Sequence, residues 1–225
     1  MKILKVIILS LIVSVPVFSQ SGAFGTTRAD VIGIYNAGRD LESRGRTQEA
    51  ETYYAQAVQA CNNEINQNLA NRDTYTALSW TLLRQRKYTE AVYWGERGLR
   101  IYTDEHRILE AMGEAYFYLN DYKNSLTFMQ RYVNALPLGD RVSIAYFFMG
   151  EIYRLENKNR LADIAYTTAV RLQPAIALWW YRLGQVRENT GEISPASDAY
   201  DRALRLNPGY QAASEGLARV RRQSR

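Results

Sequence analysis

The fold is decided by two consecutive stretches of 34 residues, SIAYFFMGEIYRLENKNRLADIAYTTAVRLQPAI (residues 143–176) and ALWWYRLGQVRENTGEISPASDAYDRALRLNPGY (residues 177–210). Each carries a large apolar residue, a second apolar residue and Gly in its first half, then Ala, an aromatic residue, Ala and Pro. The matching residues are Tyr146, Met149, Gly150, Ala162, Tyr166, Ala169 and Pro174 in the first stretch, and Trp180, Leu183, Gly184, Ala196, Tyr200, Ala203 and Pro208 in the second. Self-similarity at a fixed period of this length predicts a stack of supersecondary repeats.

The same pattern extends towards the N-terminus, in further repeats that begin at residues 31, 72 and 106. Their small residues stand at equivalent places, which are Gly38, Ser79 and Gly113 in the first halves and Ala50, Ala91 and Ser125 in the second halves. Two of the spacings between repeats exceed 34 residues, by seven and by three. Seven residues are about two helical turns. We therefore expect a longer second helix in the first repeat, or a splayed joint around residues 65–71.

The small residues have a physical reason in a pair of antiparallel helices. A Gly or Ala keeps each helix slim where the two approach most closely, and larger apolar residues one turn away then interlock. Each buried apolar side chain stabilises the packing by roughly 1.5–3 kcal/mol. A single helix pair cannot bury its own apolar face, so neighbouring pairs must stack.

This spacing resembles that of the tetratricopeptide repeat. The resemblance implies an all-α, right-handed superhelical solenoid of five helix pairs over residues 31–210. The repeats would lie near residues 31–64, 72–105, 106–139, 143–176 and 177–210, and residues 211–225 would form a capping helix and a basic tail. It also implies a protein that works by binding a protein or peptide partner.

The N-terminal segment predicts export. Lys2 and Lys5 precede an apolar run over residues 6–15, which is the plan of a secretory signal peptide over residues 1–19, cleaved after Ser19 or after Ala23. The run is too short to span a bilayer, which needs about 20 apolar residues, so no stable membrane span is expected after processing. Residues 20–30 are predicted to be a flexible lead-in. The bacterial periplasm is the expected location, since no cysteine is available for a lipoprotein anchor, and secretion is the alternative.

Charge and composition argue against several kinds of function. The net charge is +5, but the excess lies at the two ends of the chain and the centre is formally neutral, so a nucleic-acid partner is not expected. The only cysteine, Cys61, excludes an intramolecular disulfide and a Cys-based zinc site. His106 is the only histidine, and it has no cluster of ligands or catalytic partners around it in the sequence. We expect no cofactor, no metal and no enzymatic activity.

By the resemblance, the first helix of each pair lines a concave groove. The predicted partner-binding groove consists of Tyr35, Arg39, Trp80, Arg84, Glu110, Glu114, Phe117, Phe147, Glu151, Arg154, Tyr181 and Gln185. Trp, Tyr and Arg are frequent anchors of binding interfaces. The three glutamates beside Trp80 and Phe147 suggest a ligand with basic and apolar residues. The alternative for these two aromatic residues is that they only pack against neighbouring repeats.

The leading hypothesis is thus an exported scaffold that holds a peptide segment or a partner protein in an aromatic and acidic groove. Two alternatives stay open: a small-molecule-binding accessory protein of an envelope transporter, and a structural protein that assembles with itself as a homo-oligomer. The family's clamp for a free C-terminal carboxylate is not matched, because Tyr35, Arg39 and Ala77 stand where it needs Lys and Asn.

Overall fold

The computed structural model describes residues 28–223, and this part of the chain contains eleven α-helices and no strand. The predicted signal peptide, most of the lead-in and the last two residues of the basic tail lie outside the described residues. The helices are α1 Val31–Ser43, α2 Thr47–Asn66, α3 Arg72–Arg84, α4 Tyr88–Ile101, α5 His106–Tyr118, α6 Tyr122–Ala135, α7 Val142–Leu155, α8 Asn159–Leu172, α9 Ala177–Asn189, α10 Ile193–Leu206 and α11 Gln211–Gln223.

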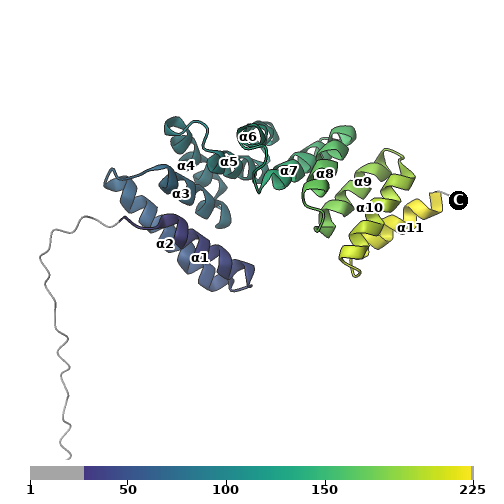
Figure 1. Cartoon of the computed structure of the whole chain (residues 1–225), viewed down its shortest axis with the longest axis horizontal. Helices are drawn as coiled ribbons and strands as arrows, with labels where there is room; N and C mark the ends of the chain where they lie inside the picture. The colour runs from purple at the N-terminus through teal and green to yellow at the C-terminus, as the bar shows by residue number, and fades with distance from the viewer. Residues whose placement is uncertain (1–27, 224–225) are drawn as a thin grey trace, which may run out of the picture.

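The helices follow one another in a single elongated array with α1 and α11 at opposite ends (Figure 1). Each odd-numbered helix packs against the helix after it, and the second helix of each pair packs against the first helix of the next pair. The first helices also touch directly, α1 with α3, α3 with α5 and α5 with α7. The predicted all-α solenoid of tetratricopeptide type is therefore confirmed, with α1, α3, α5, α7 and α9 forming what we call the inner layer.

The glycines of the repeat let an aromatic ring of the second helix lie flat against the first. A Cβ added at Gly150 would come within 2.7 Å of the Tyr166 ring, and one at Gly184 within 2.7 Å of the Tyr200 ring. Gly38 meets the Tyr54 ring at the same distance. Since real Cβ atoms do not approach a ring so closely, any larger residue at these positions would push the two helices apart.

Two repeats solve the same contact differently. In the third, Gly113 faces Met129, and the Ser125 hydroxyl donates a hydrogen bond to the Gly113 carbonyl oxygen over 2.7 Å. In the second, Ser79 replaces the glycine, and the small residues move to α4, where Gly98 lies against Tyr75 and Ile108. The close approach of the two helices is thus kept while the residue that permits it changes.

The joints between repeats explain the two long spacings. Helix α2 has 20 residues, whereas α4, α6, α8 and α10 each have 14, so the longer second helix expected in the first repeat is confirmed. The three-residue excess lies before and at the start of α7, in a longer connection from α6.

The start of the described chain is held against the extended end of α2. The Arg28 guanidinium donates to the Glu64 carboxylate over 2.8 Å, to the Leu69 carbonyl oxygen over 2.9 Å and to the Thr74 hydroxyl over 3.0 Å. Glu64 is almost fully buried. Residue 28, although within the predicted lead-in, is therefore anchored at the joint between the first two repeats.

The five turns within the helix pairs share one backbone conformation. Each has a residue with positive φ seven positions after the small residue of its first helix, namely Gly45, Arg86, Asn120, Asn157 and Gly191. Glycine adopts this left-handed region freely and asparagine is enriched there, whereas other residues pay for a close contact between Cβ and the backbone. Arg86, with φ of 59°, is the exception among the five.

The last helix covers the end of the array. Helix α11 packs on α9 and α10 and buries Ala213, Gly216, Leu217 and Val220, with the Tyr200 ring directly under Gly216. Its arginines lie on the exposed side, and Arg219 reaches back to Glu188 over 2.8 Å.

The helix packing can be tested at Ala169, which is fully buried in α8. Ala169→Asp places an unpaired carboxylate between helices and should destabilise the fold by about 3 kcal/mol or more. Thermal and urea unfolding would measure the loss. Ala175→Asp, at an exposed position in the turn before α9, is the matched control and should leave the midpoint almost unchanged. Equal midpoints for the two variants would contradict the packing described above.

The unusual turn at Arg86 generates a second prediction, with the opposite sign. Arg86→Asn introduces the residue found in the equivalent turns at Asn120 and Asn157. Because a left-handed conformation costs a non-glycine residue roughly 1–2 kcal/mol, and asparagine tolerates it better, the variant should be more stable by roughly 0.5–1 kcal/mol. A lower melting temperature for Arg86→Asn would show that the arginine side chain contributes more to folding than its backbone costs.

Candidate partner-binding groove

The predicted groove residues lie on the inner layer, where several aromatic rings stack between repeats. Tyr35 of α1 and Trp80 of α3 are stacked with ring centroids 5.1 Å apart. Phe147 of α7 and Trp179 of α9 stack in the same way, at 5.1 Å and an interplanar angle of 14°. Trp80 and Phe147 are half-buried, so each uses part of its ring to pack on the neighbouring repeat and leaves part exposed.

The remaining aromatic residues of the prediction also have neighbours. Phe117 contacts Phe148 edge to face at 4.9 Å, across the joint between α5 and α7. Tyr181 lies between Tyr200 and Tyr210, and its hydroxyl accepts a hydrogen bond from the Gln185 amide over 2.8 Å. Such contacts fix the rings before any partner arrives, which lowers the entropy cost of binding.

The three glutamates of the predicted groove all have arginine partners. Arg141, just before α7, donates to Glu110 over 2.7 Å and to Glu114 over 3.3 Å. Glu110 is only 2% exposed. These carboxylates therefore offer little free negative charge to a ligand. The basic ligand expected from the sequence stays untested, but the acidic surface on which it rests is largely neutralised from within.

Glu151 is held by an even larger set of partners. It accepts hydrogen bonds from the Tyr166 hydroxyl over 2.5 Å and from Arg154 over 2.9 Å, and Arg182 of α9 lies 2.9 Å away. Burial, together with the adjacent Glu151 charge, raises the pKa of Tyr166, so its hydroxyl keeps the proton that it donates. Arg154, predicted as a groove residue, and Arg182, which was not predicted, thus serve the same buried carboxylate.

Glu114 has an unusual protonation equilibrium. Burial, and next the negative charge of Glu110, raise its pKa to about 7, although Arg141 and Arg84 act in the opposite direction. A fraction of the molecules therefore carries a proton on this side chain near neutral pH. Arg141 therefore lies beside two carboxylates, of which that of Glu114 is partly protonated near neutral pH.

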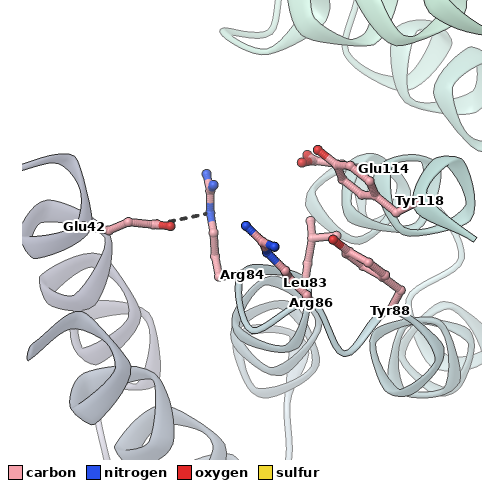
Figure 2. Close-up of a pocket in the computed structure, with 7 residues that line it drawn as sticks. All are labelled: Glu42, Leu83, Arg84, Arg86, Tyr88, Glu114 and Tyr118. Carbon is pink, nitrogen blue, oxygen red and sulfur yellow. Dashed lines mark ion pairs between the residues drawn. The ribbon is translucent and has the colours of Figure 1, made fainter. Parts of the chain in front are cut away.

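One cleft of the described chain has a volume of about 480 Å³ and is lined by Glu42, Leu83, Arg84, Arg86, Tyr88, Glu114 and Tyr118. We call it the Arg84 cleft. Figure 2 shows Arg84 and Arg86 between Glu42 on one side and Glu114 with Tyr118 on the other. Arg84 lies 3.8 Å from Glu42, and 34% of its side chain is exposed.

A smaller pocket of about 180 Å³ is lined one turn further along α3 and α5, by Trp80 and Glu110. Its apolar walls are Trp80, Tyr132 and Leu136, and its rim carries His106, Arg107, Glu110, Asp140 and Arg141. The Arg107 guanidinium lies 6.0 Å from the Trp80 ring centroid. The residues of this pocket come from α3, α5, α6 and the connection to α7, so two repeats and this connection form it together.

Several of these residues were not predicted. Arg141 lies in the three-residue excess, outside the repeat pattern, and the pairing of Arg182 with Glu151 joins two repeats. Arg86 could have been found, because aligning the five turns places it with Gly and Asn residues. Arg39, which was predicted, is exposed on α1.

Other candidate chemistry is weak in the described residues. No group of three or more His, Cys, Asp or Glu side chains there is arranged to hold a metal ion. Cys61 is fully buried, and burial raises the pKa of its thiol to about 12, which leaves it unreactive. Between residues 28 and 223, no helix is long and apolar enough to cross a membrane.

Comparisons with known proteins agree with the repeat pattern. Tetratricopeptide repeat models match residues 30–104 and 149–210, together more than half of the chain. A "Protein CTR9 homolog" of Arabidopsis thaliana is 27% identical over 119 residues, which are 53% of this chain and 10% of that protein. The chain thus spans about a tenth of the length of this relative.

Solved structures with the same fold cover most of the chain. YrrB, described as a tetratricopeptide repeat protein with an unusual peptide-binding site, aligns over 83% of this chain and 91% of its own, with 20% identity and a TM-score of 0.55. TTC0263 of Thermus thermophilus aligns over 84% and 98%, with 17% identity and a TM-score of 0.62. MamA aligns over 76% and 94%, with 18% identity and a TM-score of 0.62. At these identities the likeness concerns the fold.

The pKa of Glu114 predicts how stability depends on pH. The folded state holds its proton up to about pH 7, whereas the unfolded carboxyl loses it near 4.5, so this group favours the folded state increasingly as pH falls between these values. From pH 8 to pH 5, the wild type should gain on the order of 2 kcal/mol relative to Glu114→Gln.

Urea unfolding of both proteins at the two pH values would measure this difference. Glu90→Gln, at an exposed position of α4, is the control and should follow the wild type. The same pH dependence in Glu114→Gln and the wild type would show that Glu114 ionises normally.

Proposed function

Because the chain belongs to the tetratricopeptide repeat family, we propose that it is an exported scaffold that holds a peptide segment or a partner protein against its inner layer. Tetratricopeptide repeats are protein-interaction scaffolds and are typically not enzymes.

The observation that carries the proposal is the row of half-buried, pre-stacked rings on the inner layer, with two pockets beside it. Trp80 and Phe147 keep part of their rings exposed while the neighbouring repeat fixes their orientation. Rings ordered in this way bind without further loss of rotamer freedom. YrrB, which shares the fold, is described as having an unusual peptide-binding site, and this supports a peptide segment as the partner.

The predicted signal peptide supports export, with the periplasm as the proposed location. A small-molecule ligand and self-association are the two competing functions, and the experiment below separates them from partner binding.

Site-specific photo-crosslinking tests the scaffold. A photoreactive amino acid replaces Arg39 or Gln185, on the inner layer, and Tyr93 or Ile164, which are exposed on the second helices α4 and α8. None of the four positions belongs to the stacked ring pairs of the inner layer, and the exposed Tyr93 meets Trp94 of its own helix edge to face, so the fold should remain intact. After irradiation in the native host, the inner-layer positions should give discrete adducts with another protein, and the outer positions should give none.

Each other result has a definite meaning. Adducts between two copies of this chain would favour self-assembly. Absence of protein adducts, together with a bound small molecule seen by native mass spectrometry of the purified chain, would favour the transporter accessory. Equal capture from inner and outer positions would contradict the inner layer as the binding surface.

A further inference from the structure

The Arg84 cleft lies where the first two repeats meet the third. It is lined from α1 by Glu42, from α3 by Leu83 and Arg84, from the following turn by Arg86, and from α4 and α5 by two tyrosines and Glu114. Its volume of about 480 Å³ falls within the usual range for ligand pockets, roughly 300–1,000 Å³. No single repeat could form it, so it is a property of this particular stack.

Arg86 is kept in the cleft at a conformational cost. It is the one residue among the five equivalent turns that is neither Gly nor Asn, although all five adopt positive φ. Strained backbone positions cluster at binding and active sites, where the placement of the side chain serves the function. The turn itself gives no reason for an arginine, since Gly or Asn closes the other four.

The charges around the cleft leave Arg86 without a partner. Glu42 accepts a hydrogen bond from the Tyr54 hydroxyl over 2.7 Å and faces Arg84 at 3.8 Å. Glu114, on the opposite wall, is paired with Arg141 and is partly protonated near neutral pH. Within residues 28–223, no carboxylate forms an ion pair with Arg86. The cleft therefore presents one guanidinium without an ion-pair partner among residues 28–223, beside that of Arg84, which interacts with Glu42 and Tyr35.

The tyrosines complete a site for a side chain with an apolar stem. Tyr88 and Tyr118 are stacked, with centroids 4.8 Å apart and an interplanar angle of 16°. They form one wall of the cleft in Figure 2, and Leu83 lies beside Arg86. An arginine guanidinium group binds a carboxylate through paired hydrogen bonds. The ring edges and Leu83 can contact the methylene groups of the bound side chain.

We propose that Arg86, assisted by Arg84, binds the side-chain carboxylate of an acidic residue in the partner's segment. This inference rests on the proposed scaffold function and deepens it, since it reverses the ligand charge suggested by the sequence. The neighbouring pocket around Trp80, with its apolar walls, would take an apolar side chain of the same segment. The preferred partner is thus an extended segment with alternating acidic and apolar residues.

Four synthetic nonapeptides serve as probes, each labelled with fluorescein at the N-terminus. The first alternates Glu and Leu and is amidated at its C-terminus. The second replaces Glu with Gln, the third replaces Glu with phosphoserine, and the fourth is the Gln peptide with a free C-terminal carboxylate. Fluorescence anisotropy with the chain from residue 20 to 225 gives the affinities, at low and at high salt.

The Glu peptide should bind at least about tenfold more tightly than the Gln peptide, as a charge-assisted hydrogen bond predicts. Its affinity should fall with added salt. Arg86→Asn should weaken the Glu peptide about tenfold and reduce the salt dependence, while its melting temperature stays equal or rises. The matched control is Arg171→Asn, which removes an exposed arginine at the end of α8 and should change neither quantity.

Three outcomes would overturn the inference. Equal binding of the Glu and Gln peptides would show that the site does not recognise a carboxylate. Equal affinity of the wild type and Arg86→Asn for the Glu peptide would show that Arg86 does not bind it. Saturable binding of only the phosphoserine peptide or only the free-carboxylate peptide would assign the site to another anion. No saturable binding of any peptide at about 1 mM, a weak-affinity limit, would also overturn it.

The scaffold function is judged separately. The crosslinker at Gln185 is also placed in the Arg86→Asn variant. If both proteins capture the same amount of a partner, the scaffold function is supported and the proposed binding of an acidic side chain by Arg86 is wrong. If the wild type captures no partner from the inner layer, the proposed function itself fails.

Discussion

The whole array depends on the close approach of the two helices within each pair. In the first, fourth and fifth repeats, a glycine of the first helix lies against the face of a tyrosine ring from the second. The tyrosine hydroxyl then reaches a glutamate of the first helix, as Tyr54 reaches Glu42 and Tyr200 reaches Glu188. The ring needs the glycine for space and the glutamate for its polar end, so a single contact fixes both the distance and the rotation of the helices. Stacking of the next pair builds on a surface defined in this way.

The same glutamates connect neighbouring repeats. Glu42 faces Arg84 of the second repeat, and Glu188 binds Arg219 of the last helix. Glu151 performs this role in the fourth repeat, with Arg182. Acidic residues of the inner layer are thus used first to hold the solenoid together. Arg86, by contrast, forms no ion pair with a carboxylate of the described residues.

The fold could be predicted from the sequence, because the repeat shows in the local spacing of small and large residues. The longer α2 could also be predicted, since an excess of seven residues has few other places in a helix pair. The ion pairs could not be predicted from the sequence, because they depend on contacts between repeats. Glu110 and Glu114 were identified as groove residues, yet their partner Arg141 lies in an irregular connection for which the pattern gives no position. Trp80 and Phe147 were predicted as groove residues and lie half-buried on the inner layer, but their stacking on Tyr35 and Trp179 depends on contacts between repeats that the pattern does not give.

The irregular connection before α7 also distinguishes this joint of the array from the others. Each joint of a solenoid adds a small rotation, and these rotations accumulate along the array. Arg141 ties α7 back to α5 through two carboxylates, one of which changes its protonation near neutral pH. A small change of angle at this joint would displace α1 and α11 relative to each other by more than it displaces the residues at the joint, because displacement grows with distance from the axis of rotation. The contacts of Arg141 therefore bear on the distance between the two ends of the molecule.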